Sequence, residues 1–305
     1  MTATIKFNPI YLPTNRGHGD ARRTSIDACN NKWVALMDAD DISLPYRFEK
    51  KLKAFLSDDA LDIVGGQIAE FVGTVGNVIA RRVVPENDME IKSYAKKRCP
   101  MNQVSVMFRK DSYDNVGGYI DWYCEEDYYL WLRMIQADCR FANVPDDLVY
   151  VRVGDEMSAR RGGMKYFRSE ERLQRYMLKN HLISLPRYVY NTALRFGGEV
   201  VIPTHLRTKL FKMLRSTPEE TEVKDRIYSR EYQSVSDANY PPFSVAMCVY
   251  GKDNPEWFDE ALKSVVDQTV KPDEIVLVVD GPIPNTIQAV IDKYSRICVG
   301  GGITF

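Results

Sequence analysis

The feature that most constrains this chain is a run of apolar residues that ends in a cluster of carboxylates. Residues 34–37 are all apolar and follow Trp33, and Asp38, Asp40 and Asp41 come directly after them. Such a run is typical of a strand that is buried on both faces, between layers of helices. Open α/β sheets bind their ligands at the carboxyl ends of such strands. The run therefore predicts an α/β fold with a polar site at one edge of its sheet.

The spacing of these carboxylates suits a metal ion. Asp38 and Asp40 are two positions apart, so in an extended chain their side chains point to the same side. Carboxylate oxygens are preferred ligands of hard divalent cations, which often hold substrate phosphates as well. An acidic surface turn is the alternative interpretation.

Composition and charge exclude several classes of protein. The 305 residues are 45% hydrophobic and 27% charged, with a net charge of −1, which predicts a globular chain and no general affinity for nucleic acid. Six scattered cysteines and three histidines, with no C-x-x-C pair, predict no structural zinc site and indicate a reducing compartment. We find no signal peptide and no apolar run of 18 residues, so we predict a cytoplasmic protein.

The segment before the buried strand contains a glycine-rich turn, residues 15–19, and then a helix that we expect Asp20 to cap. Arg16, Arg22 and Arg23 lie at this turn and helix start. An anion could bind there, and a solvated basic face explains the same residues equally well.

A second acidic cluster, Glu125, Glu126 and Asp127, precedes a predicted helix over residues 128–134. Carboxylates at a helix N-terminus are favoured by the helix dipole and can be purely structural. Aromatic neighbours such as Trp122 would tune a carboxyl group that acts as a base. We therefore expect one of the three to have a catalytic role.

Residues 160–215 are strongly basic, with thirteen Lys and Arg against three Glu, in helical segments interrupted at Pro186 and Pro203. Basic amphipathic helices can lie on an anionic membrane, and a solvated face is the equal alternative. Residues 216–240 are polar and lack periodicity, which indicates a linker. Beyond them, residues 243–282 read as strand, helix and strand, with Asp280 at the tip of the second strand.

Together these motifs resemble the family 2 glycosyltransferases with the GT-A fold, particularly the bacterial polysaccharide and lipopolysaccharide enzymes. The resemblance is carried by Asn15-Arg16-Gly17, Met37-Asp38-Ala39-Asp40-Asp41, Gly117-Gly118-Tyr119, Glu126-Asp127, Arg160-Arg161-Gly162-Gly163, Pro272-Asp273-Glu274-Ile275 and Val279-Asp280-Gly281-Pro282. It implies a Rossmann-like mixed sheet flanked by helices.

The order of these motifs departs from the family, in which the strand, helix and strand seen here at residues 243–282 come first. The chain therefore resembles a circularly permuted transferase. In this interpretation residues 1–159 form the metal- and acceptor-site part of one GT-A domain, and residues 241–305 form its nucleotide-binding part. Residues 160–215 are a basic helical extension and residues 216–240 the linker. Strands exchanged between two copies, or a fragment cut across two tandem domains, are the alternatives.

The resemblance implies an inverting, metal-dependent transfer of a sugar from a UDP-sugar to a hydroxyl group of a glycan or a lipid-linked glycan. Tyr250 and Asp280 would bind the uridine. Asp38 and Asp40 would hold Mn²⁺ or Mg²⁺ at the diphosphate, and Arg22 would lie at the nucleotide-sugar.

The same resemblance implies that Asp127 is the general base and that Glu126 positions Asp127 or the acceptor. Arg160 or Arg161 would clamp the diphosphate, while Gln103 stands where the family often has histidine. The enzyme would work in the cytoplasm, with peripheral contact to the inner face of the cell membrane, and its oligomeric state stays open.

Two other functions remain as alternatives. One is a protein that binds a nucleotide-sugar without turnover. The other is a sugar nucleotidyltransferase, which needs a glycine-rich, arginine-containing loop after its first strand; residues 251–255 do not supply one.

Overall fold

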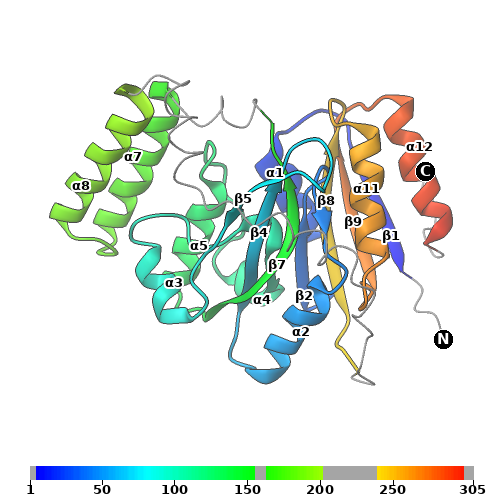
Figure 1. Cartoon of the computed structure of the whole chain (residues 1–305), viewed down its shortest axis with the longest axis horizontal. Helices are drawn as coiled ribbons and strands as arrows, with labels where there is room; N and C mark the ends of the chain where they lie inside the picture. Colours follow the sequence, from blue (N-terminus) through cyan, green and yellow to red (C-terminus); the bar gives the residue numbers. More distant parts are fainter. Residues whose placement is uncertain (1–4, 155–162, 202–238, 299–305) are drawn as a thin grey trace.

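The centre of the fold is a mixed β-sheet that lies between two layers of helices (Figure 1). The computed structural model describes residues 5–154, 163–201 and 239–298. The strands are β1 (Lys6–Leu12), β2 (Trp33–Met37), β3 (Ile42–Ser43), β4 (Ile63–Phe71), β5 (Val78–Arg82), β6 (Met107–Arg109), β7 (Phe141–Arg152), β8 (Phe243–Tyr250) and β9 (Glu274–Asp280). The helices are α1 (His18–Asp27), α2 (Arg47–Ser57), α3 (Asp88–Tyr94), η1 (Gln103–Ser105), α4 (Lys110–Asn115), α5 (Glu126–Gln136), α7 (Gly163–Lys179), α8 (Leu185–Phe196), η2 (Gly197–Val201), α11 (Pro255–Val266) and α12 (Asn285–Ile297).

The strand order of the sheet interleaves strands from the N-terminal and C-terminal parts of the chain. Along the sheet the order is β1-β9-β8-β2-β6-β4-β7-β3, and β5 pairs with β4 at the side. The first four of these strands are mutually parallel, whereas β6 is antiparallel to both β2 and β4. Two strands from the C-terminal part of the chain thus lie between β1 and β2.

The predicted buried strand is confirmed as β2, all five residues of which are buried. Trp33, Ala35 and Met37 face a core that includes α2, α11 and α12. Val34 and Leu36 face the opposite core, which includes α1, α3, α4 and α5. This alternation explains why the run has no polar residue: helices cover both faces of the strand.

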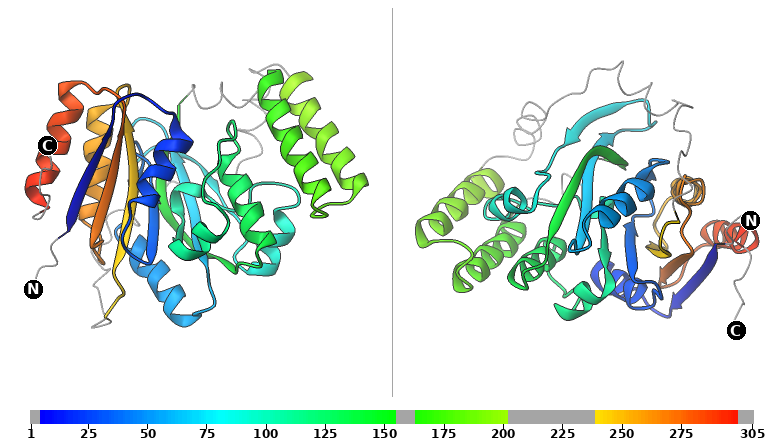
Figure 2. Two further views of the ribbon diagram at one scale, coloured as in Figure 1. Left: turned by 180° about the vertical axis from the view of Figure 1, so that it is seen from behind. Right: turned by 90° about the horizontal axis from the view of Figure 1, so that it is seen from below.

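The predicted mixed α/β architecture is confirmed. The predicted basic extension contains α7 and α8, which pack together at the end of the molecule opposite α12 (Figure 2). Among the described helices, none combines the length and the apolar composition needed to cross a bilayer. The proposed linker lies outside the described residues except for residues 239–240. Circular permutation and the division at residues 159 and 241 stay predictions.

The expected cap of α1 is wrong. The residue before the helix is Gly17, which makes no side-chain cap, and Asp20 lies inside the first turn. The backbone N–H groups of Arg16 and Gly17 instead donate to the carboxylate of Asp280, at 2.7 and 3.1 Å. A carboxylate from a strand far away in the sequence therefore satisfies the free donors near the helix start.

Two turns at this edge of the sheet approach each other so closely that one position must be glycine. Gly281 has a φ of +85°, and a Cβ atom there would lie 2.6 Å from the backbone nitrogen of Asn15. The Asp280-Gly281 pair thus joins the end of β9 to the turn before α1.

We predict that Gly281→Ala lowers the free energy of unfolding by about 2 kcal/mol or more, because it adds backbone strain to a clash with fixed backbone. Denaturant titration measures the change. Gly76→Ala is the matched control, because a Cβ atom there meets nothing within 4 Å, and we expect a change within about 0.5 kcal/mol. Equal losses in the two variants would contradict this account.

Candidate active site

The acidic turn after β2 is bound to α1 by an ion pair. Nη2 of Arg22 donates to Oδ1 of Asp38, and the Arg22 side chain is only 5% exposed. Burial by itself would raise the pKa of Asp38, but the charge of Arg22 and its hydrogen bond hold that pKa below its ordinary value. Asp38 is therefore a carboxylate at neutral pH.

Arg22 also connects the acidic turn with the start of α5. Its guanidinium lies 5.8 Å from the ring centroid of Tyr119. Burial alone would lower the pKa of Arg22, yet Asp38, together with weaker effects that include Glu126, raises it. Arg22 thus pairs with the carboxylate that follows β2 and is influenced more weakly by Glu126 of α5, and its Nη1 atom is buried without a hydrogen-bond partner among the described residues.

Two further arginines hold the acidic turn from the protein side. Arg152, at the end of β7, donates from Nε to the carbonyl of Asp40, and its backbone N–H donates to Asp41 at 2.9 Å. Arg47 of α2 is fully buried and donates from Nη2 to the carbonyls of Leu36 and Val104. Burial lowers the pKa of Arg47 to about 9 although the nearby carboxylates oppose this. These contacts fix the backbone of the turn and leave Asp40 exposed at its tip.

The third carboxylate of the turn points inward. Asp41 is 2% exposed, and burial, followed by the charges of Asp40 and Asp38, raises its pKa well above the ordinary value. Asp41 therefore has a structural role, and the pair facing the site consists of Asp38 and Asp40.

A carboxylate that the sequence analysis missed lies beside this pair. Asp253, in the turn after β8, accepts the backbone N–H of Tyr250 at 2.9 Å. Burial, and then the charges of Asp40 and Asp38, raise its pKa to about 6. The only feature of the sequence that could have indicated Asp253 is its position three residues after Tyr250, where β8 ends.

The residues expected to bind uridine lie at the ends of neighbouring strands. Tyr250 ends β8 with 41% of its surface exposed, whereas Asp280 ends β9 and is 5% exposed. Each carboxylate oxygen of Asp280 already accepts a backbone N–H from the turn before α1. The structure thus gives Asp280 an architectural role, and its contact with uridine stays a prediction.

The predicted catalytic pair opens α5, as expected. Burial, and then the charge of Asp127, raise the pKa of Glu126 to about 7. Asp127 accepts the backbone N–H of Tyr128 at 2.7 Å through Oδ1, and its Oδ2 lies 3.8 Å from Sγ of Cys99. The charge of Arg22 acts on Glu126 in the opposite direction and lowers its pKa.

Glu125 belongs to a different environment. It is 5% exposed, and burial, followed by the charges of Glu170 and Asp127, raises its pKa well above the ordinary value. Its hydrogen-bond partner is Tyr166 of α7. Of the acidic trio, Glu125 joins α5 to α7 and the other two border the site.

The donor set of the acidic turn fits a hard divalent cation. Asp40 is exposed, and the Asp38 side chain is 24% exposed although it is paired with Arg22. The residues that the structure describes contain no group of three or more His, Cys, Asp and Glu side chains arranged to hold a metal. Oxygen atoms of a bound nucleotide and water would therefore complete the coordination.

The structure brings most of the predicted site residues to one edge of the sheet. Arg22, Asp38 and Glu126 are linked by their charges, and Asp40 lies next to them. Arg160 and Arg161 lie outside the described residues. The site also depends on residues that the sequence did not indicate, namely Arg47, Arg152 and Asp253.

A mixed sheet flanked by helices, with carboxylates at its edge, is the architecture of the GT-A fold. The sequence profile of glycosyl transferase family 2 matches residues 3–138 and 244–300, which together are more than half of the chain. The chain therefore belongs to glycosyl transferase family 2. Both matched segments contribute strands to the edge described above.

Characterised and uncharacterised relatives agree with this family. An uncharacterized glycosyltransferase of Haemophilus influenzae is 41% identical over 204 residues, 67% of this chain and 75% of that protein. The amylovoran biosynthesis glycosyltransferase AmsE of Erwinia amylovora is 36% identical over 169 residues, 55% of this chain and 63% of that protein. The UDP-Gal:alpha-D-GlcNAc-diphosphoundecaprenol beta-1,3-galactosyltransferase of Escherichia coli is 32% identical over 208 residues, 68% of this chain and 75% of that protein.

The raised pKa of Glu126 predicts a specific dependence of stability on pH. Its pKa is about 7 in the folded protein against an ordinary value of 4.5, so the unfolded chain releases this proton first. As pH rises from about 4.5 to about 7, the folded state loses stability through this group, and the full loss persists above about 7. We therefore expect the free energy of unfolding of Glu126→Gln, relative to that of wild type, to be higher at roughly pH 8 than at roughly pH 5.

Denaturant titrations at the two pH values measure this change. The control is Glu90→Gln, which removes an exposed carboxyl on α3 and is measured under the same conditions. A Glu126→Gln variant that behaves like this control would contradict the environment assigned to Glu126.

Proposed function

We propose that this chain is an inverting, metal-dependent glycosyltransferase that moves a sugar from a UDP-sugar to a hydroxyl group of a glycan or a lipid-linked glycan. The observation that carries the proposal is a charged cluster at the sheet edge: Asp38 forms a buried ion pair with Arg22, and the charge of Glu126 acts on Arg22 more weakly. It joins a carboxylate suited to the diphosphate side of a donor with a carboxyl group suited to proton transfer. The E. coli relative is named for transfer from UDP-Gal to a diphosphoundecaprenol-linked sugar, which supports this class of donor and acceptor.

On the donor side, Tyr250 and Asp280 would bind the uridine, and the buried Nη1 of Arg22 would turn toward an anionic oxygen of the diphosphate. Asp38 and Asp40 would hold Mn²⁺ or Mg²⁺, which would supply Lewis-acid stabilisation of the charge that develops on the departing UDP. Arg160 and Arg161 stay proposed diphosphate ligands.

On the acceptor side, a carboxylate at the start of α5 would take the proton of the attacking hydroxyl group. Attack from the face opposite to UDP in a single displacement inverts the anomeric centre. Asp127 is our first assignment for the base, with Glu126 positioning the acceptor.

The electrostatics favour a second assignment as well. A general base works best when its pKa lies near the working pH, and burial brings the pKa of Glu126 to about 7. Both oxygens of Asp127 have neighbours on the protein side, the N–H of Tyr128 and the thiol of Cys99. In this version Glu126 takes the proton and Asp127 stabilises the helix start.

An enzyme with a lipid-linked acceptor meets that acceptor at a membrane. We therefore place its work in the cytoplasm, in peripheral contact with the inner surface of the cell membrane. Nucleic acid has no part in this proposal.

The central prediction concerns release of UDP from a panel of UDP-sugars. We expect one donor to be hydrolysed slowly without acceptor, in the presence of Mn²⁺ and not of EDTA. Asp127→Asn should lower the rate by about 10²–10⁴-fold if Asp127 is the base. The control is Asp59→Asn, an exposed carboxylate after α2, which should keep full activity.

Three results would change the proposal in different ways. A larger loss in Glu126→Gln, with a wild-type rate that falls below about pH 7, would transfer the role of base to Glu126. Metal-dependent UDP binding without release from any donor would indicate a binding protein. No UDP binding at all would contradict the proposed donor.

A further prediction tests whether one chain completes its own sheet. If β8 and β9 insert between β1 and β2 of the same chain, a monomer at high dilution should bind UDP. Light scattering coupled to gel filtration, followed by titration of the monomer peak with UDP, measures this. UDP binding confined to a dimer would instead favour strands exchanged between two copies.

A further inference from the structure

Helix α8 carries its apolar side chains on the side that faces away from the protein. At about 100° per residue, the exposed apolar residues cover about half of the helix circumference. We call this set the outer face of α8: Leu185, Pro186, Val189, Tyr190, Ala193 and Leu194. Leu185, Val189 and Leu194 have 61%, 56% and 62% of their surface exposed. Surface helices of globular proteins normally show the opposite arrangement.

Polar contacts hold the inner side of α8 in place. Nδ2 of Asn191, a residue that is 3% exposed, donates to Oε1 of Gln174 in α7 at 2.8 Å and to the carbonyl of Lys96 at 3.0 Å. Arg195 forms an ion pair with Glu170 of α7 at 2.7 Å. These contacts fix the rotation of α8 about its axis, so the apolar side has to face outward.

Cations lie next to α8, with Arg187 at the edge of the outer face and a basic run beside the inner side of the helix. The run Lys96, Lys97 and Arg98 is exposed directly beside α8, because the carbonyls of Lys96 and Lys97 accept hydrogen bonds from α8 side chains. Arg187 adds a guanidinium from α8 itself. Within the described part of the chain, these four cations take part in no ion pair.

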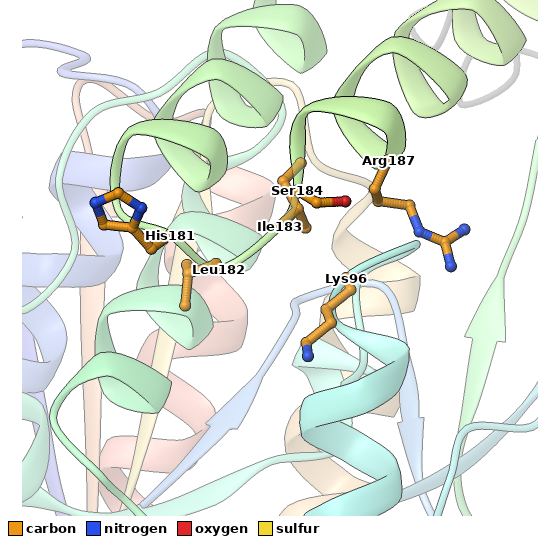
Figure 3. Close-up of a pocket in the computed structure, with 6 residues that line it drawn as sticks. All are labelled: Lys96, His181, Leu182, Ile183, Ser184 and Arg187. Atoms are coloured by element: carbon orange, nitrogen blue, oxygen red, sulfur yellow. The ribbon is translucent and has the colours of Figure 1, made fainter.

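A hollow at the start of α8 combines some of these cations (Figure 3). It has a volume of about 470 Å³ and is lined by Lys96, His181, Leu182, Ile183, Ser184 and Arg187. In Figure 3, Arg187 extends to the right of Ser184, Lys96 lies below it on another element, and His181 lies at the opposite end of the hollow. An ammonium, a guanidinium and a hydroxyl group are suitable donors for a phosphate group.

We propose that the outer face of α8, together with the adjacent cations, docks onto the surface of an anionic phospholipid bilayer. Its apolar residues would enter the boundary between headgroups and acyl chains, and the cations would contact lipid phosphates, including one in the hollow. A second copy of the chain fits less well. A two-fold contact through this face would bring the two sets of cations against each other.

Docking at α8 would orient the candidate active site. Helix α7 lies between α8 and the start of α5, where Nε1 of Trp122 donates to the carbonyl of Ser169. Glu126 and Asp127 follow Trp122 within a few residues. The α8 side of the molecule is therefore the acceptor side, and docking would present it to the membrane. This purpose rests on the proposed function, whereas lipid binding itself requires no turnover.

The test uses the full chain and sedimentation with vesicles, either of phosphatidylcholine alone or of phosphatidylcholine with phosphatidylglycerol. We expect binding to the anionic vesicles only. Val189→Ser with Leu194→Ser should weaken binding about tenfold or more, and Lys96→Gln with Lys97→Gln about fivefold per charge removed. Excess inorganic phosphate should not abolish the binding, because a free phosphate replaces only the contacts in the hollow.

Matched controls and donor hydrolysis separate this inference from the proposed function. Leu56→Ser, at a 58% exposed position of α2, and Lys271→Gln, at an exposed position before β9, should bind vesicles as wild type does. All variants should hydrolyse the donor in solution at the wild-type rate. Vesicle binding without hydrolysis of any donor would overturn the proposed function and leave the docking surface intact.

Other outcomes would overturn the docking proposal. One is vesicle binding that the α8 and lysine variants leave unchanged. Another is a wild-type monomer that does not bind anionic vesicles. A third is a wild-type dimer that does not bind them and that dissociates in the α8 variants. The dimer result would assign the outer face to a second copy of the chain.

Discussion

The acidic turn at the end of a buried strand depends on three arginines that bind its side chains and its backbone. Arg22 pairs with Asp38, the backbone of Arg152 donates to Asp41, and Arg47 lies below the turn in the core. Without Arg22, burial would raise the pKa of Asp38 and disfavour its ionised form. The arginines come from α1, α2 and β7, so the acidic turn also joins elements from different parts of the chain.

Much of the fold could be predicted because its elements have clear periodicity. The run after Trp33 predicted a strand buried on both faces, and β2 confirms it. Arg22 could be found because it stands in an arginine-rich turn close to the acidic strand in sequence. Arg47 and Arg152 could not, since a cation within a helix or strand pattern looks like a solvated side chain until the tertiary contacts are known. The cap of α1 was predicted wrongly because only tertiary contacts reveal the actual acceptor. That acceptor is the carboxylate of Asp280, which lies more than 250 residues away in sequence.

The helical extension shows a second limit of sequence patterns. Periodicity divides α8 into an apolar and a polar side, but it does not say which side packs on the protein. The packing is decided by partners such as Gln174 and Glu170, which lie on another helix. The sequence predicted that this segment is basic and amphipathic. Only the tertiary structure shows which face of the helix is exposed.

The strand order also bears on how the protein is made. Because β8 and β9 lie between β1 and β2, the two N-terminal strands cannot be joined in one sheet before the C-terminal strands have been synthesised. About 230 residues separate β1 from β8, and at about 5–20 residues per second the ribosome needs on the order of 10–50 s to make them. During that interval β2 would expose an edge that is covered in the finished molecule. Completion of the sheet therefore has to wait until β8 and β9 have been synthesised.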